Sequence, residues 1–459
     1  MIKGKIALLP LIAMIIVSID NIRNLPTIAI YGEQIIQLYT IVGLCFFVPC
    51  GFVTMTFAMT FFKNEGGIYH WVSQAFGKKM GFMAIWLQWI ENVVWFPSIV
   101  AFIAAAITHI FSISFDKYTL TALIITIFWV STWINLKGIE LTAKISLYCT
   151  ILGLIVPLSF LLLFVYYWEI YGFSYENQEV FAHMFKWHDL SSLDYSVVGI
   201  MCLSLAGLEI TAVHVPNIEN PQKKYTTAII ISMTIIILSL IVGSFSILAL
   251  TPVEKIDFID SIFLIFSDSL NKFGFSAFEP VFAFLILLGS FGGLINWIIA
   301  PIRGLMVSVQ DDFLPKIFYE ENEHNMPSYM LYIQAIIVTL LSLIFLIFDT
   351  TNKSYLILII ITAGIYLLMY IIFFLAFLKL SFEKKIFQFK SMLLNKIILF
   401  SAIIGLIFSI FAECAILMPP KQVFDNDIVI YGLSVIIGLL MFISPAFYFI
   451  KNHERRSKS

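Results

Sequence analysis

Charged residues are scarce in this sequence. Asp, Glu, Lys and Arg make up only 12% of the 459 residues, whereas a soluble globular protein carries about 25%. Hydrophobic residues make up 60%, and the mean hydropathy is +0.97. One soluble core cannot account for so much apolar sequence, but repeated apolar runs of about 20 residues, each long enough to cross a bilayer, can. The composition therefore indicates an integral membrane protein.

The sequence also lacks the residue groupings of several other protein classes. The formal net charge is −2, and no basic stripe indicates a nucleic-acid partner. The five cysteines fall within apolar runs, and none has CxxC spacing or a histidine partner that would indicate a metal or redox site. No paired carboxylates or histidine clusters indicate a membrane enzyme. We therefore expect no enzymatic activity, no metal and no cofactor.

The apolar runs predict an all-α protein with about twelve transmembrane helices and a single transmembrane domain over residues 1–459. Lys3 and Lys5 precede the first run, which continues to Ile30 without a cleavage pattern, so we expect a retained span. The connection at 251–275 is long enough for a short surface helix. The predicted spans are 6–30, 35–62, 80–110, 118–136, 143–168, 194–216, 225–250, 276–305, 328–348, 354–378, 396–418 and 428–450.

The distribution of Lys and Arg predicts the orientation of these spans. An even number of spans places both termini on one side. Of the 27 Lys and Arg residues, Arg23 lies within the first span, six lie on the side opposite the termini, and the other twenty lie on the side of the termini. We therefore expect both termini to be cytoplasmic, in the inner (plasma) membrane of a bacterium. The six residues on the opposite side are Lys117, Lys186, Lys255, Lys272, Lys353 and Lys421.

Two of the predicted spans are interrupted in a similar way. The first has charged residues in its middle, followed by Pro26, and the sixth has Gly207, Glu209 and His214 before Pro216. Broken spans at equivalent places, five apart, indicate a transporter built from an inverted repeat. The alternative is a pair of proline-kinked helices in an ordinary bundle.

An inverted repeat would divide the chain into two halves of five spans each. The first repeat would cover about 6–168 and the second about 194–378, with two peripheral helices at about 396–450. A five-span repeat reverses the membrane orientation of its second copy, which fits the predicted topology.

Around these breaks the chain resembles the amino acid–polyamine–organocation superfamily, and within it the bacterial glutamate/γ-aminobutyrate antiporter family. The resemblance covers essentially the whole chain. It is carried by Asn24-Leu-Pro-Thr27, Glu65-Gly-Gly-Ile-Tyr-His-Trp-Val72, Ala75-Phe-Gly77, Gly81-Phe82, Ala206-Gly-Leu-Glu209, His214-Val215, Asn220-Pro221, Asn296-Trp-Ile-Ile-Ala-Pro-Ile-Arg-Gly304, Gln310, Leu314-Pro315 and Pro327. One departure is span one, which has no glycine in its break.

The resemblance implies a five-plus-five inverted repeat with a midplane site between spans one, three, six, eight and ten. It also implies alternating access and the exchange of an acidic amino acid for its decarboxylated product. The expected partners are therefore an amino acid substrate and the lipid bilayer, with protons as a candidate coupling ion. The sequence leaves a homodimer open.

A broken helix suits an amino acid because its free N–H groups can meet the carboxylate and its free C=O groups can meet the ammonium. Small residues at the second break would let a ligand touch the backbone. The predicted substrate-binding residues are Ser18, Ile19, Asp20, Asn21, Ile22 and Arg23 in span one, Glu91 and Trp95 in span three, Leu205, Ala206, Gly207 and Glu209 in span six, and Asn296 in span eight.

Asp20 and Arg23 are the clearest candidates. A charge at bilayer depth costs about 2.5–3.5 kcal/mol, so it is usually retained with a partner or a role. Arg23 could bind a substrate carboxylate with two hydrogen bonds, and Asp20 could bind an ammonium group or a proton. The alternative is that the two residues, three apart, simply pair with each other.

The other polar candidates have alternatives too. Glu91 and Glu209 could carry a coupling proton, while Glu209 could equally be a structural carboxyl that accepts bonds at the break. The alternative for Trp95 is packing against a neighbouring helix, and the alternative for His214 is an ordinary core histidine. Asn296 could donate to a substrate side chain, and glycines before it would let helices pack closely.

These patterns favour an amino acid exchanger or a proton-coupled importer. A sodium-coupled symporter is a rival, since Ser18, Asp20 and Asn296 offer oxygen ligands near the break, although span eight has no conspicuous hydroxyl pair. A sensor that kept a transporter fold without transport is a rival from another class.

Overall fold

The computed structural model describes residues 7–63, 66–138, 145, 148–149, 151–171, 183, 185–189, 195–218, 220–348, 350–420 and 428–456. Lys3, Lys5, Glu65 and Lys421 lie outside the described residues, as do the side chains of His214 and Pro216 and the first residues of the fifth and sixth predicted spans.

Apart from one isolated bridge between Glu321 and Pro327, the regular structure of the described residues is helical, which confirms the predicted fold class. Ten spans within them are continuous and apolar enough to cross a membrane. They are Gly32–Thr60 (η1 Gly32–Gln34, α3 Ile35–Val42, η2 Gly43–Phe47, α4 Val48–Thr60), α6 Lys78–Phe111, α7 Lys117–Leu136, Ile151–Ile170 (η3 Ile151–Ile155, α9 Val156–Ile170), α12 Pro221–Leu250, α14 Glu279–Gln310, α15 Ser328–Ser342 with α16 Ile344–Ile347, α17 Thr351–Phe382, α18 Met392–Ala415 and α19 Ile428–Arg456.

The first and sixth spans are interrupted, as the sequence predicts. α1 (Leu8–Ile19) ends at Asp20, whose ψ of 120° leaves the helix, and α2 (Asn24–Ala29) follows. α11 (Ser196–Ser204) ends before Gly207, and the 3₁₀ helix η5 (Ile210–Asn217) continues the chain. Among the described residues, these two interrupted segments and the ten continuous candidate spans follow the order of the predicted spans. The five-plus-five inverted repeat and the residue limits of its two halves stay a prediction.

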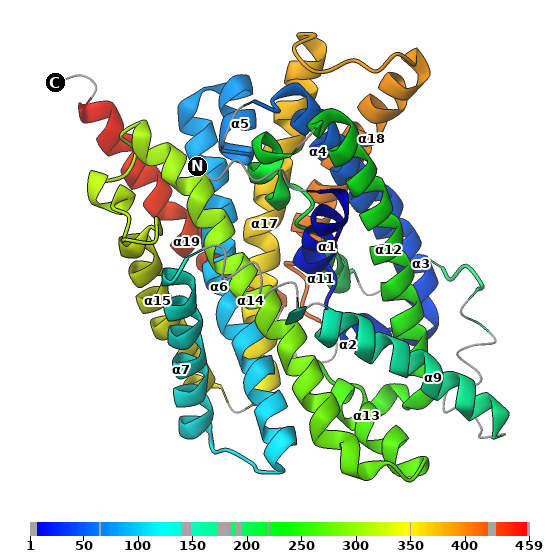
Figure 1. Cartoon of the computed structure of the whole chain (residues 1–459). Helices are drawn as coiled ribbons and strands as arrows, with labels where there is room; N and C mark the ends of the chain where they lie inside the picture. Colours follow the sequence, from blue (N-terminus) through cyan, green and yellow to red (C-terminus); the bar gives the residue numbers. More distant parts are fainter. Residues whose placement is uncertain are drawn as a thin grey trace.

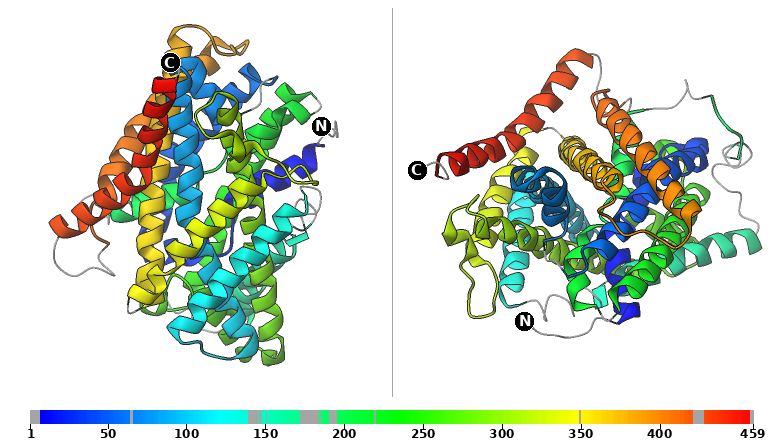
Figure 2. Two further views of the ribbon diagram at one scale, coloured as in Figure 1. Left: turned by 90° about the vertical axis from the view of Figure 1, so that its left-hand side faces the viewer. Right: turned by 90° about the horizontal axis from the view of Figure 1, so that it is seen from above.

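The centre of the bundle is formed by α6, α14 and α17. α6 packs along both of the others, and 72% of its apolar core segment is buried, as is 72% of that of α17. Only 17% of the corresponding segment of α19 is buried, and this helix lies at the outer edge of the bundle when it is seen from above (Figure 2). The candidate polar residues of span three therefore belong to a helix that has little contact with lipid.

Two short helices lie at opposite ends of the bundle (Figure 1). α5 (Ile68–Phe76) follows the second span, and α13 (Ser261–Lys272) confirms the surface helix predicted for the 251–275 connection. Three one-turn 3₁₀ helices complete the described structure, namely η6 Val253–Lys255, η7 Ser276–Phe278 and η8 Lys316–Tyr319.

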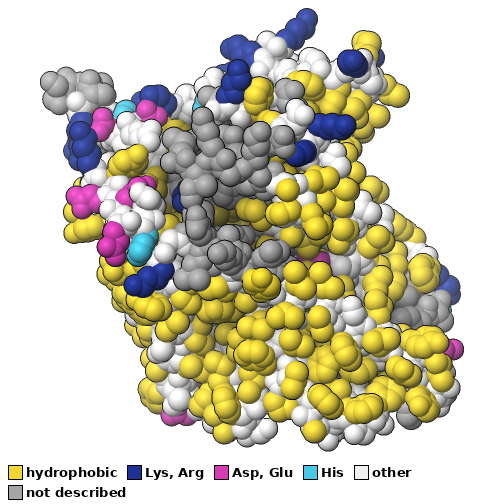
Figure 3. All heavy atoms as spheres, in the orientation of Figure 1, with side chains coloured by type: hydrophobic (Ala, Val, Ile, Leu, Met, Phe, Trp, Pro, Cys, Tyr) yellow, Lys and Arg dark blue, Asp and Glu magenta, His cyan; other side chains and the backbone are white. Residues whose placement is uncertain are grey.

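The surface of the molecule has a broad apolar face. Hydrophobic side chains cover most of the middle and lower part of Figure 3, whereas Lys and Arg gather towards its upper edge. Leu162 and Leu163 of α9 and Ile230 and Leu238 of α12 are examples of exposed apolar side chains. So large an apolar face is unusual on a soluble monomer and fits contact with lipid chains.

Candidate functional site

A cavity of about 70 Å³ is lined by residues of both helix breaks. Its walls come from α1 and α2, α6, α11, α14 and α17. These are the first, third, sixth, eighth and tenth spans, the five that the family resemblance implies. Since one water molecule needs about 10–15 Å³ of such space, the cavity is suited to a small polar molecule with several non-hydrogen atoms.

The cavity brings together about half of the predicted site residues. Seven of the thirteen line it, namely Ser18, Ile19, Asn21, Arg23, Glu91, Trp95 and Ala206. The other six are not part of its lining: Asp20, Ile22, Leu205, Gly207, Glu209 and Asn296.

Arg23 is buried, with 4% of its surface exposed. Its Nε and Nη1 atoms have no hydrogen-bond partner among the described residues. No described carboxylate lies within 4.0 Å of its guanidinium, so the alternative of an Asp20–Arg23 ion pair is not observed. The guanidinium instead lies 5.0 Å from the ring centroid of Trp95. A buried cation with free donors, held against an aromatic ring, is available to an anionic ligand.

Glu91 is the acidic residue of the cavity wall. It is 2% exposed, and the side-chain amide of Asn92 donates a hydrogen bond to its Oε1. Asn92 also donates to the carbonyl oxygen of Gln88 one turn earlier, at 2.8 Å, which fixes its orientation on α6. The cavity therefore carries a carboxyl group and a guanidinium that do not form an ion pair with each other.

The free carbonyl groups at the end of α1 are partly occupied by side chains. Trp297 Nε1 donates to the Ser18 carbonyl at 3.0 Å, and Asn24 Nδ2 donates to the Ile19 carbonyl at 3.3 Å. Asn296 Nδ2 lies 3.4 Å from Ser18 Oγ, so it supports the break from outside the cavity. Each carbonyl retains a second lone pair that a ligand could use.

The turn between α1 and α2 is stabilised by Asn21. Its Oδ1 accepts a hydrogen bond from the backbone N–H of Arg23 at 3.0 Å and another from Ser290 Oγ of α14 at 3.4 Å. A side chain that bonds the backbone two residues on is typical of an Asx turn. Ile22 is 1% exposed and packs in the core, so it anchors the break.

The second break is fixed by the tyrosines of α17. Gly207 has a φ of 114°, which favours glycine, and its N–H donates to the Tyr370 hydroxyl at 2.9 Å. A Cβ at Gly207 would lie 3.1 Å from the Trp297 ring. The indole therefore fills the space beside this glycine, while Ala206 is the small residue that faces the cavity.

Glu209 is a fully bonded carboxyl. It accepts hydrogen bonds from Gln88 Nε2 at 3.0 Å, Tyr366 OH at 2.5 Å and Tyr370 OH at 2.6 Å, and it is 2% exposed. These contacts fit the alternative in which Glu209 is a structural carboxyl that accepts hydrogen bonds at the break. Leu205 is fully buried and belongs to the core.

The sequence reasoning missed the contribution of α17. Tyr355 and Tyr366 line the cavity, and Tyr370 holds the second break. Their spacing was a usable signal, because residues 11 and then 4 positions apart lie on one face of a helix. Trp297 also lines the cavity. The centroids of its ring and of the Trp95 ring lie 6.0 Å apart, and the two rings meet in an edge-on arrangement.

Comparison with known proteins agrees with this architecture. The family model described as amino acid permease matches residues 6–442.

The chain belongs to the amino acid permease family.

Three relatives of this permease are similar over its full length. An uncharacterized transporter of Legionella pneumophila is 31% identical, over 99% of the chain and 98% of the relative. The glutamate/gamma-aminobutyrate antiporters of two Lactococcus lactis subspecies, lactis and cremoris, are each 27% identical, over 99% of the chain and 92% of the relative. The permease is thus similar to membrane transporters, among them antiporters.

At one end of the permease, α5 is tied to the end of α14. The Tyr69 hydroxyl donates to Asp311 Oδ2, and Lys78 Nζ donates to Asp311 Oδ1 at 2.5 Å. Burial and the neighbouring Asp311 carboxylate raise the pKa of Tyr69, so the phenol stays protonated and remains a donor.

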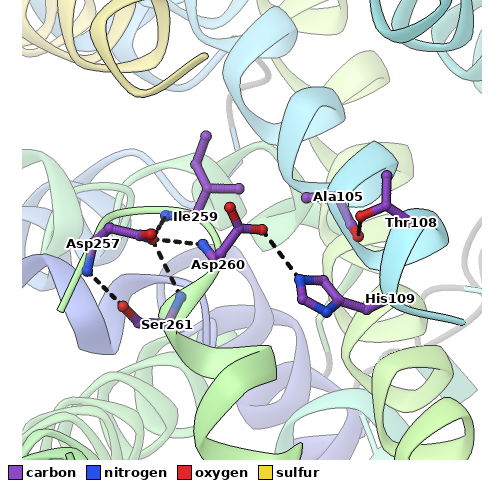
Figure 4. A network of polar contacts seen from close by, with 7 residues as sticks. All are labelled: Ala105, Thr108, His109, Asp257, Ile259, Asp260 and Ser261. Carbon is purple, nitrogen blue, oxygen red and sulfur yellow. Dashed lines mark hydrogen bonds and ion pairs between the residues drawn. The ribbon is translucent and has the colours of Figure 1, made fainter. Parts of the chain in front are cut away.

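At the other end, a polar network joins α13 to α6 (Figure 4). Asp260, just before α13, lies 3.1 Å from His109 Nε2 near the end of α6. Asp257 Oδ1 accepts backbone N–H bonds from Ile259, Asp260 and Ser261, which orders the start of α13. α13 also packs against α2, so this network reaches the second half of span one.

Proposed function

We propose that this permease is an amino acid antiporter of glutamate/γ-aminobutyrate type that works by alternating access. The single observation that carries the proposal is that Arg23 and Glu91 line the same cavity but form no ion pair with each other. An amino acid presents a carboxylate and an ammonium group. The Arg23 guanidinium would bind the first and the Glu91 carboxylate the second, so that each buried charge gains a partner when substrate enters.

The relatives support the choice of substrate. Two of them are glutamate/gamma-aminobutyrate antiporters. Both of those molecules carry a carboxylate together with an ammonium group, which is what the two cavity residues would recognise. The second carboxylate of glutamate would then lie near polar residues of the same wall, among which Asn24 and Tyr355 are candidates.

Alternating access would open and close the two ends of the bundle in turn. The Tyr69–Asp311–Lys78 cluster and the His109–Asp260 network each tie a short helix to a long one, at opposite ends of the bundle (Figure 1). In this proposal each cluster holds one end of the bundle closed. Substrate binding between the two breaks shifts the population between the state that is open at one end and the state that is open at the other.

The proposed location is the bacterial inner membrane, with both termini cytoplasmic. The excess of Lys and Arg on the predicted cytoplasmic side supports this orientation, and such residues gather at the α5 end in Figure 3. In that orientation the Tyr69–Asp311 cluster is the cytoplasmic one.

The proposal is tested with purified permease in liposomes. Liposomes that are preloaded with γ-aminobutyrate should take up labelled glutamate, and empty liposomes should not. A requirement for sodium would support a symporter instead, and no flux of any amino acid would support a sensor without transport.

Site variants sharpen this test. Arg23→Ala should raise the glutamate concentration for half-maximal exchange about 10–100-fold, because a hydrogen bond to a charged group contributes about 1.5–3 kcal/mol. Lys316→Ala, which removes an exposed cation outside the cavity, is the control. Equal concentration dependence in the parent and in Arg23→Ala would refute the assignment of Arg23.

A further inference from the structure

Asp20 is the one residue of the first break whose side chain is ionisable but does not line the cavity. It directly follows α1, and 3% of its surface is exposed. Its Oδ2 is hydrogen-bonded to Ser239 Oγ of α12, a helix that packs along α1. The carboxyl group is therefore placed at the interface between a helix break and a long neighbouring span.

The hydrogen count at Ser239 favours a protonated Asp20. The Ser239 hydroxyl lies 2.9 Å from the carbonyl oxygen of Ile236 as well as within hydrogen-bond distance of Asp20 Oδ2. A hydroxyl has one hydrogen, and both a carbonyl and an ionised carboxylate only accept. If Asp20 is ionised, the two acceptors compete for that hydrogen. If Asp20 is protonated, it donates to Ser239, Ser239 donates to Ile236, and every group is satisfied.

Among the described residues, no cation is placed to hold an ionised Asp20. No described Lys, Arg or His nitrogen lies within 4.0 Å of its carboxyl group, and Arg23 points into the cavity. The titratable neighbour is Tyr39 of α3, whose hydroxyl shares a hydrogen bond with Ser244 of α12 at 3.2 Å. α12 presents Ser239, and α14 presents Asn296 and Trp297 towards the end of α1, none of them charged. Glu209, before η5, is held by Tyr366 and Tyr370.

We propose that Asp20 is a proton-binding site that couples proton movement to the rearrangement of α1 against α12. This rests on the proposed transport function. With its proton, the carboxyl group can stay buried at the α1–α12 interface. When α1 moves in alternating access and Asp20 meets water, the O–H bond breaks, the proton passes to water, and the carboxylate remains hydrated. Return of α1 requires that a proton is taken up first, because an unpaired charge at bilayer depth is costly.

The test compares the parent with Asp20→Asn, a neutral side chain of the same shape, in liposomes. Asp116→Asn is the matched control, because Asp116 is an exposed helix cap whose function asparagine can replace. Glutamate/γ-aminobutyrate exchange without a pH gradient tests the proposed function itself. Uptake under an inward proton gradient, with a pH-sensitive dye inside the liposomes, tests the inference.

The parent and Asp116→Asn should respond to the proton gradient with at least a several-fold rise in uptake and with proton entry. Asp20→Asn should keep gradient-free exchange within about threefold of the parent and lose the gradient response, since its neutral side chain mimics the protonated state. An unchanged gradient response in Asp20→Asn would overturn the inference and leave the exchange function standing.

Two further measurements keep the inference falsifiable. If Asp20→Asn does not fold, Ser239→Ala should shift the pH midpoint of exchange, and an unchanged midpoint would count against the site. If the parent exchanges no amino acid, the infrared C=O band of a protonated carboxyl, followed in a pH titration, tests proton binding directly. Loss of one component of that band in Asp20→Asn, or a shift in the frequency of that component in Ser239→Ala, supports the site, and identical titrations in all proteins contradict it.

Discussion

Gly153 and Gly289 lie backbone against backbone. A Cβ added to Gly153 would come within 2.0 Å of the Gly289 amide nitrogen, and one added to Gly289 within 2.5 Å of the Gly153 carbonyl oxygen. The fifth and eighth spans therefore meet without intervening side chains, as small residues permit in membrane helices. The close contact explains why a glycine stands at position 289, seven residues before Asn296.

Gly289→Ala should lower the thermal stability of the purified permease, by about 1–3 kcal/mol, because backbone atoms cannot move aside as a flexible side chain can. Gly293→Ala is the matched control on the same helix. Its added Cβ would meet only Asn21 Nδ2, at 3.7 Å, so the melting temperature should stay close to that of the parent. Equal melting temperatures of the two variants would contradict the close contact.

Substitution by glutamine should affect substrate binding at Glu91 and protein stability at Glu209. Glu91→Gln removes a charge from the cavity wall and should raise the glutamate concentration for half-maximal exchange about tenfold or more. Glu209→Gln disturbs a carboxyl that accepts three hydrogen bonds, so it should lower stability by about 1–3 kcal/mol with little change in that concentration. Exchange kinetics and thermal melts on both variants separate these effects, and a reversed pattern would mean that the two roles are exchanged.

The Tyr69–Asp311 bond should keep its full stabilising effect up to a pH of about 10. Because burial and Asp311 raise the pKa of Tyr69, the folded protein holds the phenol proton more tightly than the unfolded chain does. The resulting stabilisation is complete below the unfolded pKa of about 10 and is lost only as the pH rises above it. Tyr69→Phe should lower stability by about 1 kcal/mol at neutral pH. Lys78→Ala should have a smaller effect, since this lysine is mostly exposed.

His109→Gln should loosen α13 without unfolding the bundle. Glutamine lacks the imidazole ring whose Nε2 lies 3.1 Å from Asp260 and which stacks on Phe263 of α13, with 4.7 Å between the ring centroids. Amide hydrogen exchange of Ser261–Lys272 should therefore become faster in the variant, while that of α5, at the opposite end, stays unchanged. Unaltered exchange in α13 would show that the Asp257 turn alone holds this helix in place.

Much of the fold was predictable because hydrophobicity and chain length decide it. A run of about 20 apolar residues has few alternatives to a membrane helix, and proline beside charge marked both breaks. The ends of the helices were less predictable. α17 was expected at 354–378 and covers Thr351–Phe382, and α19 continues to Arg456, because a helix can run on beyond the apolar layer that defines the span in the sequence.

The candidate site was predictable in part. Arg23 and Glu91 stood out because charge is conspicuous in an apolar helix, and both line the cavity. Which way a side chain points at a break is not encoded by periodicity, since the helical repeat is lost there. Asp20 and Arg23, only three residues apart, consequently face α12 and the cavity respectively. Tyrosines were overlooked because they are common in membrane helices for other reasons.

The Tyr370 hydroxyl makes two hydrogen bonds: it accepts one from the Gly207 N–H and donates one to the Glu209 carboxyl group. Tyr366, one turn earlier on α17, shares that same acceptor and touches the cavity. A ligand that displaces Tyr366 would thus be linked to Gly207, in the break of the sixth span, by three hydrogen bonds: Tyr366–Glu209, Glu209–Tyr370 and Tyr370–Gly207. The cavity wall and the backbone at Gly207 are therefore connected through one carboxyl group and two hydroxyl groups, so a change at one can be transmitted directly to the other.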